Sequence, residues 1–406
     1  MKNYTIEELM SALGCEKWPE RWKEFYSEVV SDLASHGNEL ADPEYYEQLS
    51  QKYDVLVDHK EIYKQAAREI AENEELSLFF ALLLRALKDR KTIMSDIARL
   101  SMPKAPEGRS AVGYDMLPAL AMCQSIPAFY DSMKARGIPD DIIYPSLRIA
   151  EGSVAVYIKK HNGNPGYGNF DWFQLAYDGK LFRIGNLQLE FPAGFPGIAM
   201  VLENEKGEQI TLATNVKLHR DGFPLGSVNF EDEEGAWTAT VEETDTEYIG
   251  YPYNDRGWVS HDRITLSKSE WKVVFKGGDR MVSLHIPAGV GFGNDAVEET
   301  LRMSREFIEK YFPEYDYKAF FCGSWLLDRQ LVDILGEEAN ISKYCKRFTP
   351  LAVKSGGKSV FTFVFNKPDQ NFEISELPEN TRLERALKAH YLSGGAIYET
   401  FGFFMK

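Results

Sequence analysis

Cysteine is scarce in this sequence, and no two cysteines lie close together. The 406 residues include only Cys15, Cys123, Cys322 and Cys345, and none of them belongs to a C-x-x-C pair. This spacing excludes the common zinc-binding and thiol–disulfide motifs. We therefore expect reduced thiols that mostly fill the core, and no bound metal.

Basic residues are also in short supply. The chain carries 46 lysines and arginines against 62 aspartates and glutamates, which gives a formal net charge of −16. A charge of this sign repels nucleic acids and anionic membranes at long range. The composition therefore argues against nucleic-acid and membrane partners, and it leaves the oligomeric state open.

No apolar run is long enough to cross a membrane. The longest, Leu76–Leu84, is interrupted by Ser77, whereas a spanning helix needs about 20 apolar residues. Glu7 and Glu8 precede any apolar stretch, so no cleavable signal peptide is recognisable. We expect a cytoplasmic globular protein whose longest apolar run is a buried helix.

Residues 1–138 have the pattern of a helical domain. Thr5 and Glu8 have the spacing of a capping box, and Gly14 lies where a short first helix would end. Apolar residues then recur every three or four positions, which predicts a bundle of four to six helices. Glycine, proline and two aspartates over 137–141 break this pattern, so we place a domain boundary near residue 138.

The stretch 139–278 changes to short β-branched and aromatic runs separated by turn residues. This pattern is typical of antiparallel strands, and Asp178-Gly179 is a typical hairpin turn. The expected strands are Val154–Ile158, Trp172–Tyr177, Leu181–Leu189, Ile210–Leu218, Ala236–Glu242 and Val273–Phe275.

The region 279–406 alternates strands with helices. It begins with a strand over Met281–Ile286, a glycine-rich turn over Pro287–Gly293 and a helix that ends near Tyr311. The elements expected after these are a strand over Tyr317–Cys322, a helix over Ser324–Leu335, strands over Ser342–Val353 and Ser359–Phe365, a helix from Thr381 to about Gly394, and a strand over Ile397–Met405. The fold class is therefore α+β, with a helical N-terminal bundle followed by a mixed-sheet region.

The glycine-rich turn is the clearest candidate for a binding site. A turn that leads into a helix N-terminus offers unpaired backbone N–H groups and the positive end of the helix dipole, which suit a pyrophosphate. Gly289, Gly291 and Gly293 allow a close approach of the backbone, and Asn294 begins the helix. These four residues are our candidate cofactor-binding residues; a plain strand-to-helix turn is the alternative.

The order strand, glycine turn, helix, strand is used by acetyl-coenzyme A dependent N-acyltransferases of the GNAT type. The chain also resembles, over nearly its whole length, bacterial acyltransferase-domain proteins, in which a helical N-terminal domain precedes a GNAT-like C-terminal domain. The residues that carry the resemblance are Leu181–Glu190, His285–Pro287, Cys322–Asp328 and Asn340-Ile-Ser with Arg347-Phe348.

This resemblance implies an acyltransferase that moves an acyl group from acetyl-coenzyme A or another acyl-coenzyme A to an amine of a small molecule or peptide. It implies a GNAT-like region over 139–406, with 279–406 as the cofactor half and a possible second GNAT-like lobe before it. The usual GNAT pattern begins with Gln or Arg, whereas here Ala288 precedes Gly291 and Gly293. The missing Gln or Arg affects how tightly this turn would bind coenzyme A.

Three residues are the main candidates for catalysis under this interpretation, and Tyr344 is a less favoured substitute for one of them. His285 would deprotonate the amine, and Ser324, or less favourably Tyr344, would protonate the leaving thiolate. Cys322 could instead act as a covalent nucleophile. Each has a structural alternative: a hydrogen-bonded histidine at a strand end, a helix N-cap for Ser324 and an inert core cysteine.

Two other classes of protein compete with the enzyme. The first is a degenerate acyltransferase that binds a carbohydrate, peptide or acyl metabolite on an aromatic surface; its candidate residues are Tyr248, Tyr251, Tyr253 and Trp258. The same aromatics could simply cover the sheet. The second is a serine hydrolase, which the sequence disfavours because the stretch around Ser324 lacks the second glycine of G-x-S-x-G.

Overall fold

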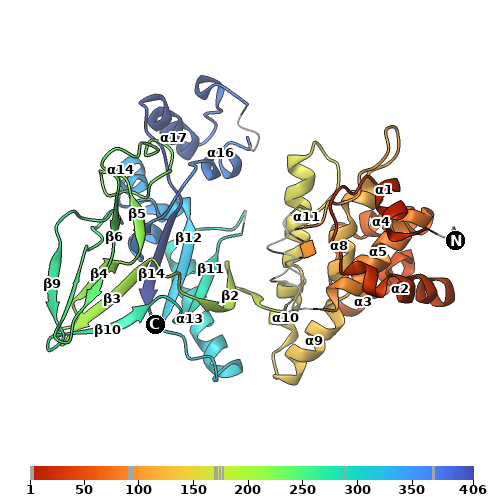
Figure 1. Ribbon diagram of the computed structural model, residues 1–406, viewed down its shortest axis with the longest axis horizontal. Coiled ribbons are helices and arrows are strands. Elements are labelled where there is room, and N and C mark those ends of the chain that lie inside the picture. The colour runs from red at the N-terminus through yellow and green to blue at the C-terminus, as the bar shows by residue number, and fades with distance from the viewer. Residues whose placement is uncertain are drawn as a thin grey trace. The chain divides into compact units, whose positions relative to one another are not determined.

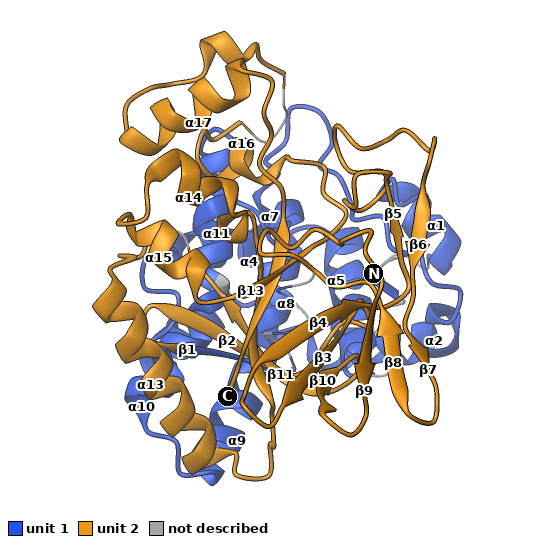
Figure 2. Cartoon of the chain, turned by 90° about the vertical axis from the view of Figure 1, so that its left-hand side faces the viewer, with its two compact units in different colours: residues 1–183 blue, residues 184–406 orange. Residues whose placement is uncertain are grey.

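The chain folds into two compact units. The computed structural model describes residues 4–89, 96–97, 99–168, 172, 175, 178–287, 289–367 and 371–406. The first unit contains residues 1–183 and the second residues 184–406 (Figure 2). The expected boundary near residue 138 therefore lies inside the first unit. Its turn residues only separate two helices, and Pro139 is the N-cap of the second of them.

The first unit is helical, as predicted (Figure 1). The Thr5–Glu8 capping box is confirmed, with the Thr5 hydroxyl accepting a hydrogen bond from the Glu8 N–H. Helix α5 carries the longest apolar run and is buried in the core of the unit. The helices are α1 (Ile6–Ala12), α2 (Trp22–His36), η1 (Glu39–Ala41), α3 (Pro43–Tyr53), α4 (Lys60–Ala71), α5 (Glu74–Leu87), α7 (Val112–Asp115), α8 (Leu117–Cys123), α9 (Ile126–Ala135), α10 (Asp140–Leu147) and α11 (Ile149–Lys160).

One predicted strand in this unit is wrong. Val154–Ile158 lies inside helix α11, with Val154 fully buried against the helical core. Burial of one side of a helix outweighs the weak strand preference of a few β-branched residues. The strand expected over 172–177 lies mostly outside the described residues, and Trp172 and Leu175, which are described, are helical.

The second unit is built on a six-stranded sheet in the order β1-β2-β11-β12-β14-β13. Its other strands form the small antiparallel sheets β10-β3-β4, β5-β6 and β7-β8-β9. The strands are β1 (Leu181–Ile184), β2 (Leu187–Gly194), β3 (Ala199–Asn204), β4 (Gln209–Ala213), β5 (Val216–Leu218), β6 (Trp237–Ala239), β7 (Glu242–Glu243), β8 (Glu247–Gly250), β9 (Ile264–Ser267), β10 (Trp271–Lys276), β11 (Arg280–His285), β12 (Ala319–Ser324), β13 (Thr349–Ala352) and β14 (Thr400–Met405).

The helices of this unit come late in the chain. They are α13 (Asn294–Tyr311), η2 (Trp325–Leu327), α14 (Gln330–Leu335), α15 (Asn340–Lys346), α16 (Ser359–Phe363), η3 (Ile374–Glu376) and α17 (Arg382–Leu392). The predicted strand, turn and helix around residues 281–311 are confirmed as β11 and α13, and the Thr381–Glu384 capping box is present. Residues 184–287, all of which are described, contain no helix. This stretch therefore does not repeat the strand, turn and helix of residues 281–311, and the second GNAT-like lobe stays a prediction.

Several boundaries differ from the sequence prediction. The expected strand Ser342–Val353 is the helix α15 followed by the short strand β13, and Ser359–Phe365 begins with the helix α16. Both segments are rich in residues that favour strands. In the structure, however, these residues pack on a buried aromatic core from one face of a helix, and this packing outweighs the local preference. The expected strand Leu181–Leu189 is a hairpin of β1 and β2, and the expected helix Ser324–Leu335 is split into η2 and α14.

An aromatic core fixes one face of the six-stranded sheet. Phe195, Phe275 and Phe403 are almost completely buried, and their ring centroids lie 4.2 to 5.7 Å apart. Phe275 comes from β10 and Phe403 from β14, so this contact joins a small sheet to the central one. Among the described residues, no helix has the length and hydropathy needed to cross a membrane.

Helix α17 offers a matched test of this packing. Leu387 is fully buried, whereas Leu392 at the end of the same helix is 60% exposed. Replacing Leu387 by Ala removes buried methyl groups and leaves a cavity, so we expect Leu387→Ala to lower the free energy of unfolding by about 2–5 kcal/mol. The control Leu392→Ala should change it by less than about 0.5 kcal/mol. Urea denaturation followed by circular dichroism measures both, and equal effects would contradict the packing described for α17.

Candidate functional site

The parallel strands β11 and β12 pair at one end only. Their register joins Met281 to Ala319 and continues as far as Ser283 opposite Phe321. Beyond that point β11 stays paired with β2 up to His285, and β12 stays paired with β14 up to Ser324. The two strands therefore diverge, and the backbone groups that face the opening have no partner strand.

His285 lies at the end of β11, beside this opening. Its Nε2 is 2.8 Å from Oε2 of Glu190, which projects from the neighbouring strand β2. The antiparallel register places Glu190 opposite Ser283, two residues before His285. Glu190 and His285 are therefore diagonal neighbours on one face of the sheet. The two side chains are about one quarter exposed, at 27% and 22%, so solvent can still reach them. The carboxylate fixes the orientation of the ring.

The glycine turn that follows β11 is open. A Cβ atom at Gly289, Gly291 or Gly293 would meet no atom within 4 Å. Only Gly289 has a positive φ, of 78°, so neither backbone conformation nor packing demands glycine at 291 and 293. Gly293 is the N-cap of α13, and no side chain caps the first N–H groups of that helix. The turn therefore presents bare backbone at a helix N-terminus.

The hairpin between β1 and β2 supports the turn from one side. The Asn186 side chain donates a hydrogen bond of 2.9 Å to the carbonyl of Gly291, and its backbone N–H donates to Thr300 Oγ1 of α13. At Gly185, where φ is 50°, a Cβ would lie 2.4 Å from the same Thr300 oxygen. Glycine is therefore required at 185 for the hairpin to approach α13, and this contact explains one of the sequence motifs quoted above.

Arg347, at the C-terminal end of α15, supports the turn from another side. Its guanidinium donates to Oδ1 of Asn294 and to Oε1 of Glu298, both in the first turns of α13, and to the carbonyl of Lys343 at 2.9 Å. The Arg347 side chain is 16% exposed. A cation is thus held at the first residue of the helix that follows the glycine turn.

An aromatic contact joins the turn to α15. Phe292 makes an edge contact with Tyr344 of α15, at a centroid distance of 4.6 Å. Tyr344 is buried next to Cys322 of β12, and burial raises the pKa of both groups, that of Cys322 to about 12. A thiol with this pKa is protonated at neutral pH, which disfavours a role as nucleophile. The phenol keeps its proton and can donate it.

Ser324 ends β12 and begins the short helix η2. Its Oγ accepts a hydrogen bond of 3.2 Å from the N–H of Leu326, which is the N-cap role considered above as the alternative. Asp328, a few residues later, is buried and accepts hydrogen bonds from the N–H groups of Gln330 and Tyr398. Burial raises the Asp328 pKa, and these bonds offset part of that effect. The side chains of Ser324 and Asp328 therefore hold the backbone of the segment that follows β12 through hydrogen bonds.

The other candidates from the sequence do not gather at this site. Tyr251 and Tyr253 pack half-buried against the small core that Trp237 also covers, and Trp258 packs on Phe223 and Phe230. These aromatics therefore cover the sheets, which is the plainer of the two expectations. Within the described part of the chain, no three His, Cys, Asp or Glu residues come together as a metal site.

Sequence reasoning had assigned no role to Glu190, Asn186 or Arg347. Each lies in a stretch that carried the family resemblance, which was the available signal. Their positions depend on strand register and on a contact between α15 and α13, and neither can be derived from local spacing.

Solved structures with the same fold are acyltransferases. Three of them match this chain with TM-scores of 0.59 to 0.60 at 21% sequence identity, over 98% of both chains. They are an acyltransferase in complex with decanoyl-CoA and teicoplanin, one with CoA and 10C-teicoplanin, and a mutant acyltransferase with octanoyl-CoA. None of the curated proteins compared with the chain matches it.

Family models match both parts of the chain. Residues 58–179 match the N-acyltransferase N-terminal domain, and residues 181–404 match the GNAT-like C-terminal domain. The second match alone covers more than half of the chain. The protein therefore belongs to the GNAT-like acyltransferase family, as an N-acyltransferase whose helical N-terminal domain precedes a GNAT-like C-terminal domain.

Proposed function

We propose that acyl transfer takes place in the opening between β11 and β12, from an acyl-coenzyme A to an amine. The observation that carries this proposal is the one-ended pairing of these strands next to an open glycine turn. An extended pantetheine arm can take the place of the missing partner strand by hydrogen bonding to the exposed backbone. The thioester would then lie beside His285.

The residues at the turn fit the phosphates of coenzyme A. The bare N–H groups that begin α13 and the Arg347 guanidinium supply positive charge. Arg347 thereby takes over the role of the Gln or Arg that this chain lacks before Gly291. Asn294 offers its backbone N–H, while its side chain holds Arg347 in place. Ala288 itself lies outside the described residues.

The reaction proceeds by direct attack. The neutral amine nitrogen forms a bond to the thioester carbonyl carbon, and backbone N–H groups stabilise the oxyanion. Because the Nε2–H of His285 donates to Glu190, the Nδ1 atom is the base that takes the proton from the amine nitrogen. The carbon–sulfur bond then breaks, and the thiolate leaves with the bonding electron pair. Ser324 or Tyr344 returns a proton to sulfur, and the amide product is released.

For the substrates, we propose a medium-length acyl chain and an amine carried by a small molecule or peptide. The basis is the set of ligands found with proteins of the same fold, namely octanoyl-CoA, decanoyl-CoA and teicoplanin. A chain with net charge −16 also attracts an ammonium-bearing acceptor more readily than an anionic one.

A ligand titration followed by product analysis tests this function. A ligand present at a hundred times its Kd stabilises the folded state by about 2.7 kcal/mol. We expect the unfolding temperature to rise with decanoyl-coenzyme A, and mass spectrometry to show an amide when a panel of amino sugars and peptide amines is added. No thermal shift at millimolar thioester would refute the proposal.

The His285–Glu190 pair generates a graded kinetic prediction. His285→Gln removes the base and should lower kcat by about 100- to 10,000-fold at nearly constant KM for the thioester. Glu190→Gln keeps a hydrogen-bond acceptor but loses the charge, so we expect a loss in kcat of about tenfold. The control Glu203→Gln on β3 should leave kcat unchanged. A rise in KM without loss of kcat would assign the pair to binding instead.

The open turn generates a prediction for cofactor affinity. A Cβ at Gly291 would meet no atom of the chain within 4 Å, so Gly291→Ala should fold like the natural protein and serves as the uncharged reference. Gly291→Asp places a negative charge near the phosphates, and Coulomb repulsion should raise KM for the thioester by about ten- to a hundredfold while kcat changes little. Steady-state kinetics at varied ionic strength measure this, because added salt should reduce the difference. Equal KM values for the two variants would exclude phosphates from this turn.

The buried thiol distinguishes direct attack from a covalent route. With its pKa raised to about 12, Cys322 is ionised in only about one molecule in 10,000 at pH 8. We expect iodoacetamide to leave it unmodified in the folded protein and to modify it in urea, as peptide mass spectrometry would show. Cys322→Ala should keep most of kcat. An inactive, folded Cys322→Ala variant with a trapped acyl-cysteine in the natural protein would establish the covalent route.

A further inference from the structure

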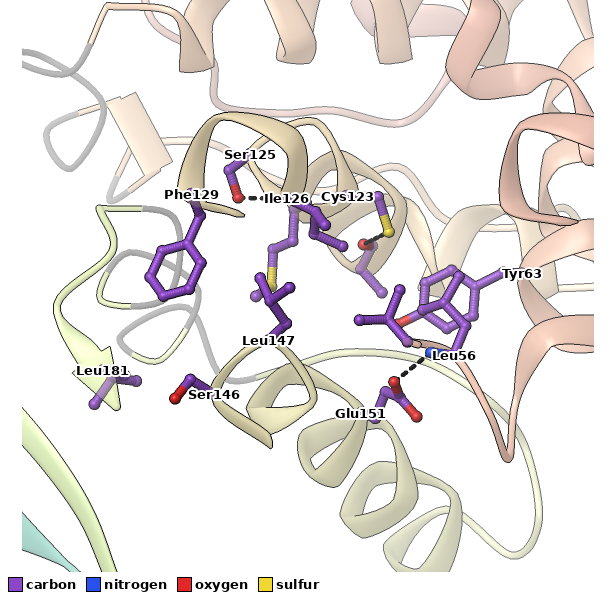
Figure 3. Close-up of a pocket in the computed structure, with 13 residues that line it drawn as sticks. Leu56, Tyr63, Cys123, Ser125, Ile126, Phe129, Ser146, Leu147, Glu151 and Leu181 are labelled. Carbon is purple, nitrogen blue, oxygen red and sulfur yellow. Dashed lines mark hydrogen bonds between the residues drawn. The ribbon is translucent and has the colours of Figure 1, made fainter. Parts of the chain in front are cut away.

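The pocket of the helical unit is too small for a substrate. Side chains from α8, α9, α10 and the segment before α4 converge on it (Figure 3). Its free space is about 30 Å³, which is room for about two water molecules. An alkyl chain or a substituted amine does not fit there, so this pocket offers no site for an acceptor.

Glu399, in the second unit, is a carboxylate without a cationic partner. It directly precedes β14, and its side chain accepts hydrogen bonds from the Ser355 hydroxyl and, at 3.3 Å, from the Ser359 N–H. Ser355 is 2% exposed, and its Oγ also accepts from the N–H groups of Gly357 and Glu399. Among the described residues, no lysine, arginine or histidine forms an ion pair with Glu399. The negative charge is therefore fixed in position but not neutralised.

The Glu399 carboxylate keeps its charge at neutral pH. Burial raises its pKa, but hydrogen bonds from Ser355 and Ser359 outweigh burial, so the pKa of Glu399 is lowered overall. Glu399 is only half-buried, so solutes can reach it. A carboxylate held in this way suits a cation, because an ammonium group supplies the counter-charge that the chain does not.

His285 and Glu399 belong to one face of the central sheet. Met281 of β11 and Phe403 of β14 share the aromatic core on that face, and alternate residues of an extended chain project to the same face. Two-residue steps from Met281 to His285 and from Phe403 to Glu399 therefore assign both to this face. Strand β12 lies between β11 and β14 (Figure 1). Because neighbouring strands are about 4.8 Å apart, the two residues are at least about 10 Å apart.

The sheet between these two residues is open to solvent. Gly323 of β12 pairs with Phe401 of β14, is exposed, and has no side chain that would separate His285 from Glu399. The half-buried Phe401 ring reaches over this position, since a Cβ at Gly323 would come within 3.0 Å of its Cε1 atom. An aliphatic spacer can therefore pack on the Phe401 ring, with one polar end toward each of the two residues.

We propose that Glu399 binds a second cationic group of the acceptor, at least about 10 Å from the amine that reacts at His285. The acceptor class is thus a molecule with two amines separated by an aliphatic spacer. This inference rests on the proposed function, because His285 marks the reacting amine only if acyl transfer takes place there. The unneutralised charge at Glu399 rests on the hydrogen bonds and the missing ion pair alone.

Two acceptors that differ in one group test this assignment on the unaltered chain. 1,8-Diaminooctane carries a second ammonium group, whereas 8-amino-1-octanol carries a neutral hydroxyl in its place. With decanoyl-coenzyme A as donor, we expect kcat/KM, corrected for the two equivalent amines, to be about five- to tenfold higher for the diamine. Added salt should reduce this preference. Equal kcat/KM values for the two acceptors would overturn the proposal.

A variant separates charge from structure at this position. In Glu399→Gln the amide oxygen still accepts hydrogen bonds from Ser355 and Ser359, so the chain should fold, but the preference for the diamine should disappear. The matched control Glu231→Gln removes one negative charge from an exposed residue and should keep the preference. A merely structural role of Glu399 would change kcat/KM equally for both acceptors, and that result would refute the cation site.

Binding without turnover distinguishes this proposal from the proposed function. Isothermal titration of 1,8-diaminooctane needs no thioester, and we expect Glu399→Gln to raise its Kd about five- to tenfold, with Glu231→Gln unchanged. If no thioester reacts in the natural protein, the proposed function fails, and the titration alone decides whether Glu399 binds a cation. Equal Kd values for the natural protein and Glu399→Gln would show that it does not.

Discussion

The incomplete pairing of β11 and β12 is the constraint on which the rest of the second unit depends. A central strand of a sheet normally pairs on both sides, because an unpaired backbone group that is buried costs free energy. Here β2 holds β11 as far as His285, and β14 holds β12 as far as Ser324, so each strand keeps one partner beyond the point where the two separate. The opening is therefore built into the pairing of the sheet, and the backbone edges that border it have no partner strand.

The opening offers a reason for two glycines in the turn that nothing inside the chain requires. Positive φ explains Gly289, and contact with Thr300 explains Gly185, but no conformational or packing reason explains Gly291 and Gly293. Glycine costs conformational entropy in the folded state, so its use at an open turn favours close approach by something outside the chain. The contacts from Asn186 and Arg347 hold this turn in shape before any ligand arrives, which lowers the entropy cost of binding.

Local signals in the sequence were sufficient for the helical character of the first unit and for residues 281–311, and insufficient where tertiary packing decides. A short apolar strand, a glycine turn and an amphipathic helix follow one another around residues 281–311, and each has its own sequence signature, so this segment was predictable. The helices α15 and α16 were mistaken for strands because their aromatic and β-branched residues serve tertiary packing. Glu190 was out of reach, because only the register between β2 and β11 brings it to His285.

The acidic composition of the chain opposes binding of a phosphate-rich carrier at long range, but most of the acidic residues are too far from the turn to matter. At physiological ionic strength, charges more than about 8 Å apart in solvent are largely screened, so most of the 62 acidic residues exert little force at the turn. Short-range contacts decide affinity there. Glu298 lies close, but it bonds Arg347 and holds the guanidinium beside Asn294. Under the proposed function, an acidic residue thus positions the cation that meets the phosphates of the carrier.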